Sequence, residues 1–181
     1  MKTIITLIGL LFCSTIIAQT NYYTETKTFY EDGYTYQCDV SPSKFVTLYN
    51  KENKFTYKNQ IYKDTGKRFV MPEVGIDLTE DDNWTQTKRH SIVIEAFTEA
   101  EKQKVKGHEL MTTIIINSNT GKIDEVYFEF VNLQPYATIP ISVFRKIELE
   151  LKKNVWFSPT ADGKKLNYIL LWWDQDPSEP I

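Results

Sequence analysis

The sequence predicts an α+β protein, in which one main helix packs on an antiparallel sheet as a β-β-α-β unit preceded by β-rich hairpins. Two patterns support this class. Several short stretches rich in aromatic and β-branched residues are separated by turn residues, as strands require. A later stretch, Ile141–Val155, instead has apolar residues at helical spacing.

The first 18 residues have the pattern of a secretory signal peptide. Lys2 supplies a positive charge, Thr3–Ile17 is apolar, and Ala18 suits a cleavage site. This apolar run is shorter than the roughly 20 residues that a membrane span needs. We therefore expect export to the periplasm or the extracellular space. The mature chain, residues 19–181, is expected to be a single domain that does not span a membrane.

The charge of the chain bears on nucleic acid as a partner, and its cysteine content bears on disulfide bonds. The chain has 21 basic and 24 acidic residues and a net charge of −3, without a basic stripe, so nucleic acid is not an expected partner. Cys13 lies inside the signal, which leaves Cys38 alone in the mature chain and excludes an intramolecular disulfide. A cysteine of this kind is more often a buried small hydrophobe than a reactive thiol, and pairing with another chain stays open.

The front of the mature chain is predicted to form two hairpins. The first joins strands over Thr24–Tyr30 and Tyr34–Val40 through the tight turn Asp32-Gly33. The second joins Phe45–Tyr49 and Lys54–Tyr57 around a polar loop of four residues. The many tyrosines suit ordinary amphipathic strands better than a sugar-stacking surface.

The acidic stretch Asp77–Asn83 raises the question of a bound cation. Calcium favours clustered carboxylate oxygens, yet the stretch lacks both the Asp-x-Asp-x-Asp-Gly spacing and the distal Glu of a calcium loop. The two histidines, His90 and His108, have no Asp or Cys at ligand spacing. We expect a solvated acidic loop, two histidines in solvated loops, and no metal or other cofactor.

The middle of the chain has one clear helix signal. Ser91–Phe97 suits either a strand or the beginning of a helix. Thr98 with Glu101 forms a capping box, which predicts a short helix over residues 100–106, with Gly107 directly after its end.

The last third predicts strand, turn, strand, helix, turn and strand. Met111–Ile116 and Ile123–Val131 are expected to form a hairpin, and Pro140 to begin the helix. Leu166–Trp173 is the closing strand, with apolar residues on both faces. Glu148 forms a favourable i,i+4 pair with Lys152 on the helix. The core-facing stripe of the helix is Ile141, Phe144, Ile147, Leu151 and Val155.

Three short motifs mark this last third: Gly121-Lys122-Ile123, Trp156-Phe157-Ser158-Pro159 and Gly163–Leu166. Their order resembles that in the C-terminal domain of TonB-like energy-transducer proteins. The resemblance concerns residues 85–175 and implies that fold, together with a habit of pairing strands with a partner. Energy transduction is not implied, because we find no retained anchor or Pro-rich linker and the β-rich half, residues 19–76, has no counterpart.

The chain as a whole also resembles the short exported proteins of unknown function of Bacteroides-type bacteria. The Tyr-rich opening Asn21–Thr24, the stretch Tyr34–Val40 and the segment Leu48–Glu52 carry this resemblance. It implies a compartment and no particular activity.

The sequence favours a non-catalytic module that binds a protein or peptide through an exposed strand edge or aromatic patch. Trp172 and Trp173 are the first candidates for partner contact, and Trp84 is the third. The alternative is a glycan-binding accessory protein that stacks sugars on exposed Trp or Tyr rings. An enzyme is not expected, because Gly-x-Ser-x-Gly, His-Glu-x-x-His and Cys/His pairings are missing from the sequence.

Overall fold

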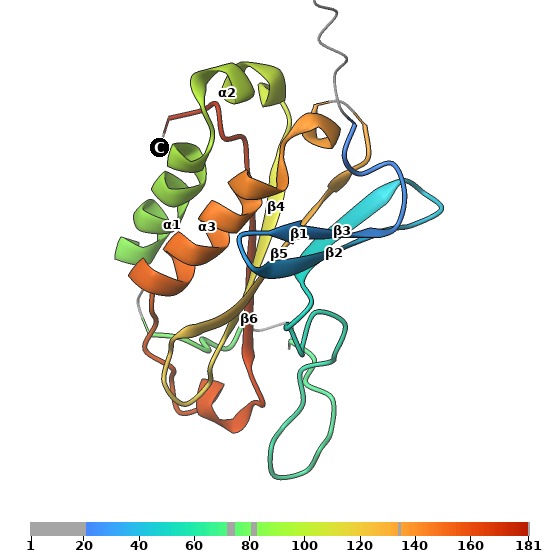
Figure 1. Cartoon of the computed structure of the whole chain (residues 1–181). Helices are drawn as coiled ribbons and strands as arrows, with labels where there is room; N and C mark the ends of the chain where they lie inside the picture. Colours follow the sequence, from blue (N-terminus) through green and yellow to red (C-terminus); the bar gives the residue numbers. More distant parts are fainter. Residues whose placement is uncertain (1–20, 72–74, 81–82, 134, 181) are drawn as a thin grey trace, which may run out of the picture.

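The structure is a six-stranded antiparallel sheet with helices packed against one of its faces (Figure 1). This computed structural model describes residues 21–71, 75–80, 83–133 and 135–180. The strand order is β1-β2-β3-β5-β4-β6, which makes β1 and β6 the edge strands. The α+β class expected from the sequence is confirmed. The strands are β1 (Lys27–Glu31), β2 (Tyr34–Val40), β3 (Phe45–Asn50), β4 (Leu110–Ile116), β5 (Ile123–Val131) and β6 (Ile169–Gln175).

The first predicted hairpin is confirmed. β1 and β2 pair antiparallel, with Glu31 opposite Tyr34. Asp32 and Gly33 between them have φ values of 45° and 80°, the left-handed conformation that a tight turn requires.

The second predicted hairpin is wrong. β3 forms as expected but pairs with β2 on one side and β5 on the other, and residues 54–57 form no strand. Glu125 of β5 explains the difference. Its carboxylate accepts hydrogen bonds from the backbone N–H of Lys54 (2.6 Å) and of Phe55 (3.0 Å). A side chain therefore satisfies backbone groups that a hairpin ladder would otherwise have used.

The ambiguous segment Ser91–Phe97 belongs mostly to helix α1 (Asn83–Ala96), which begins earlier than the sequence suggested. The predicted short helix is confirmed as α2 (Glu99–Val105), with both hydrogen bonds of the capping box present at Thr98. It is followed by Gly107 at φ 79°.

The order predicted for the last third is also confirmed. β4 and β5 form a hairpin, α3 (Ile141–Asn154) follows, and β6 then pairs with β4 on the side away from β5. β3 pairs with β5, so the front and back of the chain share one sheet.

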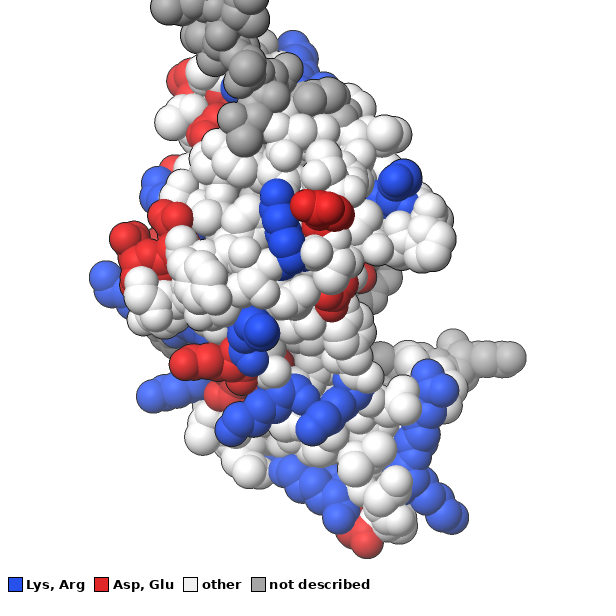
Figure 2. All heavy atoms as spheres, turned by 45° about the vertical axis from the view of Figure 1, so that its right-hand side comes forward, with Lys and Arg blue, Asp and Glu red and all other residues white. Residues whose placement is uncertain are grey.

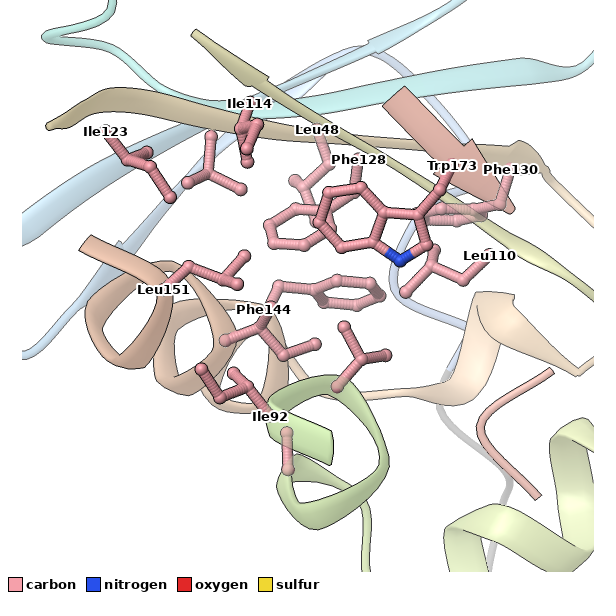
Figure 3. Close-up of a cluster of buried hydrophobic side chains, with 14 of the residues drawn as sticks. Leu48, Ile92, Leu110, Ile114, Ile123, Phe128, Phe130, Phe144, Leu151 and Trp173 are labelled. Carbon is pink, nitrogen blue, oxygen red and sulfur yellow. The ribbon is translucent and has the colours of Figure 1, made fainter. Parts of the chain in front are cut away.

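The core lies between the sheet and the helices (Figure 3). Phe144 and Leu151 of α3 and Ile92 of α1 face Phe128 and Trp173 of the sheet. The Phe128 and Phe144 ring centroids are 5.1 Å apart, within the range of a favourable aromatic pair. The predicted stripe of α3 is buried throughout.

Cys38 points into the same core. It is fully buried and free, as expected of a cysteine that acts as a small hydrophobe. In the described part of the chain, no helix is long and apolar enough to cross a membrane. The expected signal peptide lies outside the described residues.

Candidate functional site

The two adjacent tryptophans of β6 lie on opposite faces of the sheet. Trp173 is only 7% exposed and packs in the core, where its indole N–H donates to the side-chain oxygen of Gln175 (2.8 Å). Trp172 points the other way and is 56% exposed. Of this pair, Trp172 alone is available to a partner.

His90 is part of helix α1 rather than of a solvated loop, so that expectation is wrong. Its ring stacks on Trp173, with centroids 6.1 Å apart. Burial, followed by the charge of Arg89, lowers the pKa of His90, so the imidazole is neutral near pH 7. His108 is exposed in the loop after α2, as expected.

We use the term open sheet face for the side chains of the six strands that point away from the helices. Strand register arranges them in rows that cross the sheet. One row, the aromatic row, consists of Tyr49, Tyr127, Thr113 and Trp172, which are paired in sequence from β3 to β6. Tyr127 and Thr113 are buried between their neighbours, whereas Trp172 at the edge is exposed.

The next row on the same face is acidic. It consists of Thr47, Glu129, Met111 and Asp174, again paired across β3, β5, β4 and β6. Asp174 is exposed and Glu129 is partly buried. Burial raises the pKa of the Glu129 carboxyl, and the Thr47 hydroxyl partly offsets this.

Apolar side chains continue the face beyond the acidic row. Phe45 and Val131 are opposite each other on β3 and β5, and they are 37% and 47% exposed. Leu133, just after β5, is 63% exposed. The open sheet face therefore combines exposed apolar groups with carboxylates.

The other end of the open sheet face is covered by the segment after β3. Phe55 packs on Tyr168 with ring centroids 4.8 Å apart. Tyr57 packs edge-on against Tyr49, and both hydroxyls donate to Asp39, at 2.7 Å and 2.9 Å. Tyr49 and Tyr168 are packed amphipathic side chains, as the sequence favoured, whereas Tyr57 remains 66% exposed.

This covering segment is basic. Residues 51–68 contain six Lys and Arg and two acidic residues. Figure 2 shows Lys and Arg side chains gathered over the lower part of the molecule, and Figure 1 places this segment in that part. The two ends of the open sheet face thus differ in charge.

Trp84 is the third residue that the sequence suggested for partner contact, and its ring packs against that of Trp156. Trp84 is near the beginning of α1 and Trp156 follows α3. Their ring centroids are 4.6 Å apart, and the rings are 47% and 56% exposed. The pair forms a second exposed aromatic surface, which the sequence did not reveal.

A cleft of about 690 Å³ lies between the loop after β3, the beginning of β5 and the end of α3. Its lining includes Asn50, Lys54, Asp124 and Lys152. Asn50 and Lys152 are both held by Glu148, whose side chain is 1% exposed.

The Glu148 carboxylate is the centre of a buried network. One oxygen accepts from the Lys152 ammonium (2.7 Å) and the Asn50 amide (3.4 Å), and the other from the Arg145 guanidinium (3.2 Å) and the Tyr36 hydroxyl. The predicted Glu148–Lys152 pair is therefore confirmed, in a buried setting that helical spacing did not indicate. Removal of one partner from such a network destabilises the native state, because a buried charge then loses its compensation.

Among the residues that the structure describes, no three His, Cys, Asp or Glu side chains are placed to hold a metal ion. Asp81 and Asp82 of the acidic stretch lie outside the described residues, and Asp77 is exposed.

Comparison with known proteins agrees with this fold. Residues 19–173 match the family described as "Domain of unknown function (DUF5043)". The chain is similar to the crystal structure of a DUF5043 family protein from Bacteroides uniformis ATCC 8492, with 46% sequence identity and a TM-score of 0.83. The match covers 89% of this chain and 96% of the other. Comparison with curated proteins gives no match.

Proposed function

For this chain, which belongs to the DUF5043 family, we propose an exported, non-catalytic module that binds a protein or peptide on its open sheet face. The observation that carries the proposal is the exposure of Trp172. Its side chain is 56% exposed on an edge strand, although its neighbour Trp173 is buried. Tryptophan is among the residues that contribute most to binding when a partner covers them.

The surroundings of Trp172 support a contact surface rather than an isolated exposed ring. Met111 lies in the adjacent row, and Phe45 and Val131 extend the exposed apolar surface along the same face. Contiguous apolar groups rimmed by polar ones mark interaction sites on soluble proteins.

The edge of β6 offers a second mode of contact. Among the described strands, β4 alone pairs with β6, so the opposite edge of β6 has no strand beside it. An extended segment of a partner could add to this edge by main-chain hydrogen bonds. The resemblance to the TonB-like C-terminal domain belongs to this proposal as well, since it implies strand pairing with a partner.

The binding function is tested with a displayed library of random peptides selected on the immobilised protein. We expect selected peptides to bind the wild type and the Trp84→Ala variant, and to lose at least about tenfold in affinity for Trp172→Ala. Trp84 is a matched control because it is an exposed tryptophan away from the open sheet face. Peptides that bind all three proteins equally would refute the proposal, as would a selection that yields no binder.

Export is supported by the charged, apolar and small-residue order of residues 1–18. The test is mass spectrometry of the protein from the cytoplasmic, periplasmic and culture fractions of the same cells. We expect a chain that begins at Gln19 outside the cytoplasm. A chain that keeps Met1 and remains in the cytoplasm would contradict export.

A second candidate function is supported by the Trp84–Trp156 pair. Two exposed rings at 4.6 Å form a platform on which a sugar ring can stack, so a glycan-binding role is the alternative. A glycan array separates the two proposals. Retention that Trp84→Ala abolishes and Trp172→Ala preserves would favour the glycan role over the peptide role.

A further inference from the structure

The open sheet face differs from the rest of the protein in charge. The chain has 21 Lys and Arg, yet none of them occupies an outward position on the six strands. Four carboxylates do: Asp39, Glu125, Glu129 and Asp174. The strand side chains of this face therefore carry only acidic charge, whereas the segment after β3 that covers one end of the face is basic.

Two of these four carboxylates are used inside the fold. Asp39 accepts hydrogen bonds from the hydroxyls of Tyr49 and Tyr57. Glu125 accepts from the backbone N–H of Lys54 and Phe55. Each has a structural role, and neither is needed for an outside partner.

The other two carboxylates are different. Glu129 accepts one long hydrogen bond, 3.5 Å from the Thr47 hydroxyl. Within the described residues neither Glu129 nor Asp174 forms an ion pair with a Lys or Arg. Glu148 differs from both of them, because its buried carboxylate forms ion pairs with Arg145 and Lys152.

The strand register determines the positions of the Glu129 and Asp174 carboxylates. Both are directly opposite Met111, Glu129 on β5 and Asp174 on β6. Neighbouring strands are about 4.8 Å apart, so the two side chains begin about 10 Å apart with an apolar side chain between them. Trp172 lies in the next row, close enough for a cation near Asp174 to lie over its ring.

We propose that the partner of the open sheet face is a cationic segment, in which Lys or Arg residues bind Glu129 and Asp174 while neighbouring apolar residues cover Met111, Trp172 and Val131. This inference rests on the proposed function and names the chemistry of its partner. The partly buried Glu129 gains a counter-charge on binding, which offsets the cost that burial imposes on its ionised form.

The experiment uses three synthetic peptides of equal length that alternate leucine with lysine, serine or glutamate. Their affinities are measured for the full protein, for the double variant Glu129→Gln/Asp174→Asn, and for the control Glu95→Gln/Asp64→Asn. The control removes the same charge from two exposed positions outside the six strands, Glu95 on α1 and Asp64 in the covering segment. Trp172→Ala is measured in parallel, together with the peptides selected from the random library.

We expect the lysine peptide to bind the wild type and the control at least about tenfold more tightly than the serine peptide, and to weaken as salt is raised. The double variant should lose this preference. If the selected peptides need Trp172 but bind the double variant as well as the wild type, the cationic partner is refuted and the proposed function stands. If no peptide depends on Trp172, the proposed function fails as well.

Discussion

Trp172 and Trp173 are neighbours in sequence with opposite environments: the first is 56% exposed and the second 7% exposed. The alternation of side chains along β6 accounts for this, because successive residues of a strand point to opposite faces. The same alternation separates the core from the surface proposed to bind a partner. A change at either position therefore has a distinct consequence.

We predict that Trp173→Ala destabilises the fold by about 3–5 kcal/mol, because it leaves a large cavity between β6 and α1. Trp172→Ala should change the free energy of unfolding by less than about 1 kcal/mol, since the exposed ring has little packing to lose. Urea denaturation of the two variants checks both values. An equal loss of unfolding free energy in both variants would mean that Trp172 has a structural role. Trp172→Ala would then be unsuitable as a test of binding.

The Glu148 network gives a second prediction. Glu148→Gln removes the negative charge that Arg145 and Lys152 share, and we expect a loss of about 3 kcal/mol or more in the free energy of unfolding. Tyr36→Phe should cost about 1–2 kcal/mol, because it removes one hydrogen bond to the carboxylate.

The control for this network is Glu150→Gln on the same helix. Glu150 is only partly buried and accepts from the Asn154 amide (2.7 Å), a bond that glutamine can keep. We expect a change within about 0.5 kcal/mol. If Glu148→Gln were as mild as this control, the buried charge would not be needed for the fold.

Much of the fold could be predicted from local patterns. The capping box at Thr98, the apolar stripe of α3 and the turn at Asp32-Gly33 are each determined by residues close in sequence, and the structure confirms all three. The hairpin expected around residues 50–53 is wrong because its alternative depends on Glu125, more than 70 positions away. Local patterns contain no information about such a bond.

The candidate site was accessible to sequence reasoning only in part. An aromatic pair near the C-terminus pointed to Trp172, but the acidic row depends on the register of four strands. Glu129 and Asp174 are 45 positions apart and meet through Met111 on a third strand. Their placement on one face of the sheet follows from the strand pairing alone. The contact between Trp84 and Trp156 could not be predicted for the same reason, because the two residues are far apart in the sequence.

Two glycines with the same backbone conformation provide a third prediction. Gly121 and Gly66 have φ values of 73° and 68°, so replacement by alanine costs each a similar conformational penalty of about 1–2 kcal/mol. A Cβ on Gly121 would lie 1.8 Å from the Phe157 carbonyl oxygen, whereas nothing lies within 4 Å of one on Gly66.

We therefore expect Gly121→Ala to cost about 3 kcal/mol or more, and Gly66→Ala to show the conformational penalty alone. Thermal unfolding of both variants measures the difference. A Gly121→Ala variant no worse than Gly66→Ala would mean that the segment after α3 can move away from the β4–β5 turn.

The Cys38 thiol gives a fourth prediction. Burial, with a smaller contribution from Asp39, raises the pKa of this thiol to about 12. The thiol is therefore protonated at pH 8 and shielded from reagents, since the thiolate is the reactive form. A thiol-specific reagent should modify the native protein no faster than the protein unfolds, and the denatured protein at once. Rapid modification of the native protein would show that the β1–β2 region opens without global unfolding.

Glu129 gives the last prediction, which links stability to binding. Its carboxyl has a pKa raised by burial, so between the ordinary value of 4.5 and the raised value the folded protein binds more protons than the unfolded one. Stability contributed by this group therefore falls as pH rises through that range. Glu129→Gln should make the free protein more stable at pH 7, by less than about 1 kcal/mol for a partly exposed group, and should leave it unchanged at about pH 3.5. Glu95→Gln, at an exposed position, should show neither effect. Denaturation at the two pH values tests this directly. A Glu129→Gln variant that is less stable at pH 7 would mean that the carboxylate already has an internal partner, and would remove the physical reason for a cationic one.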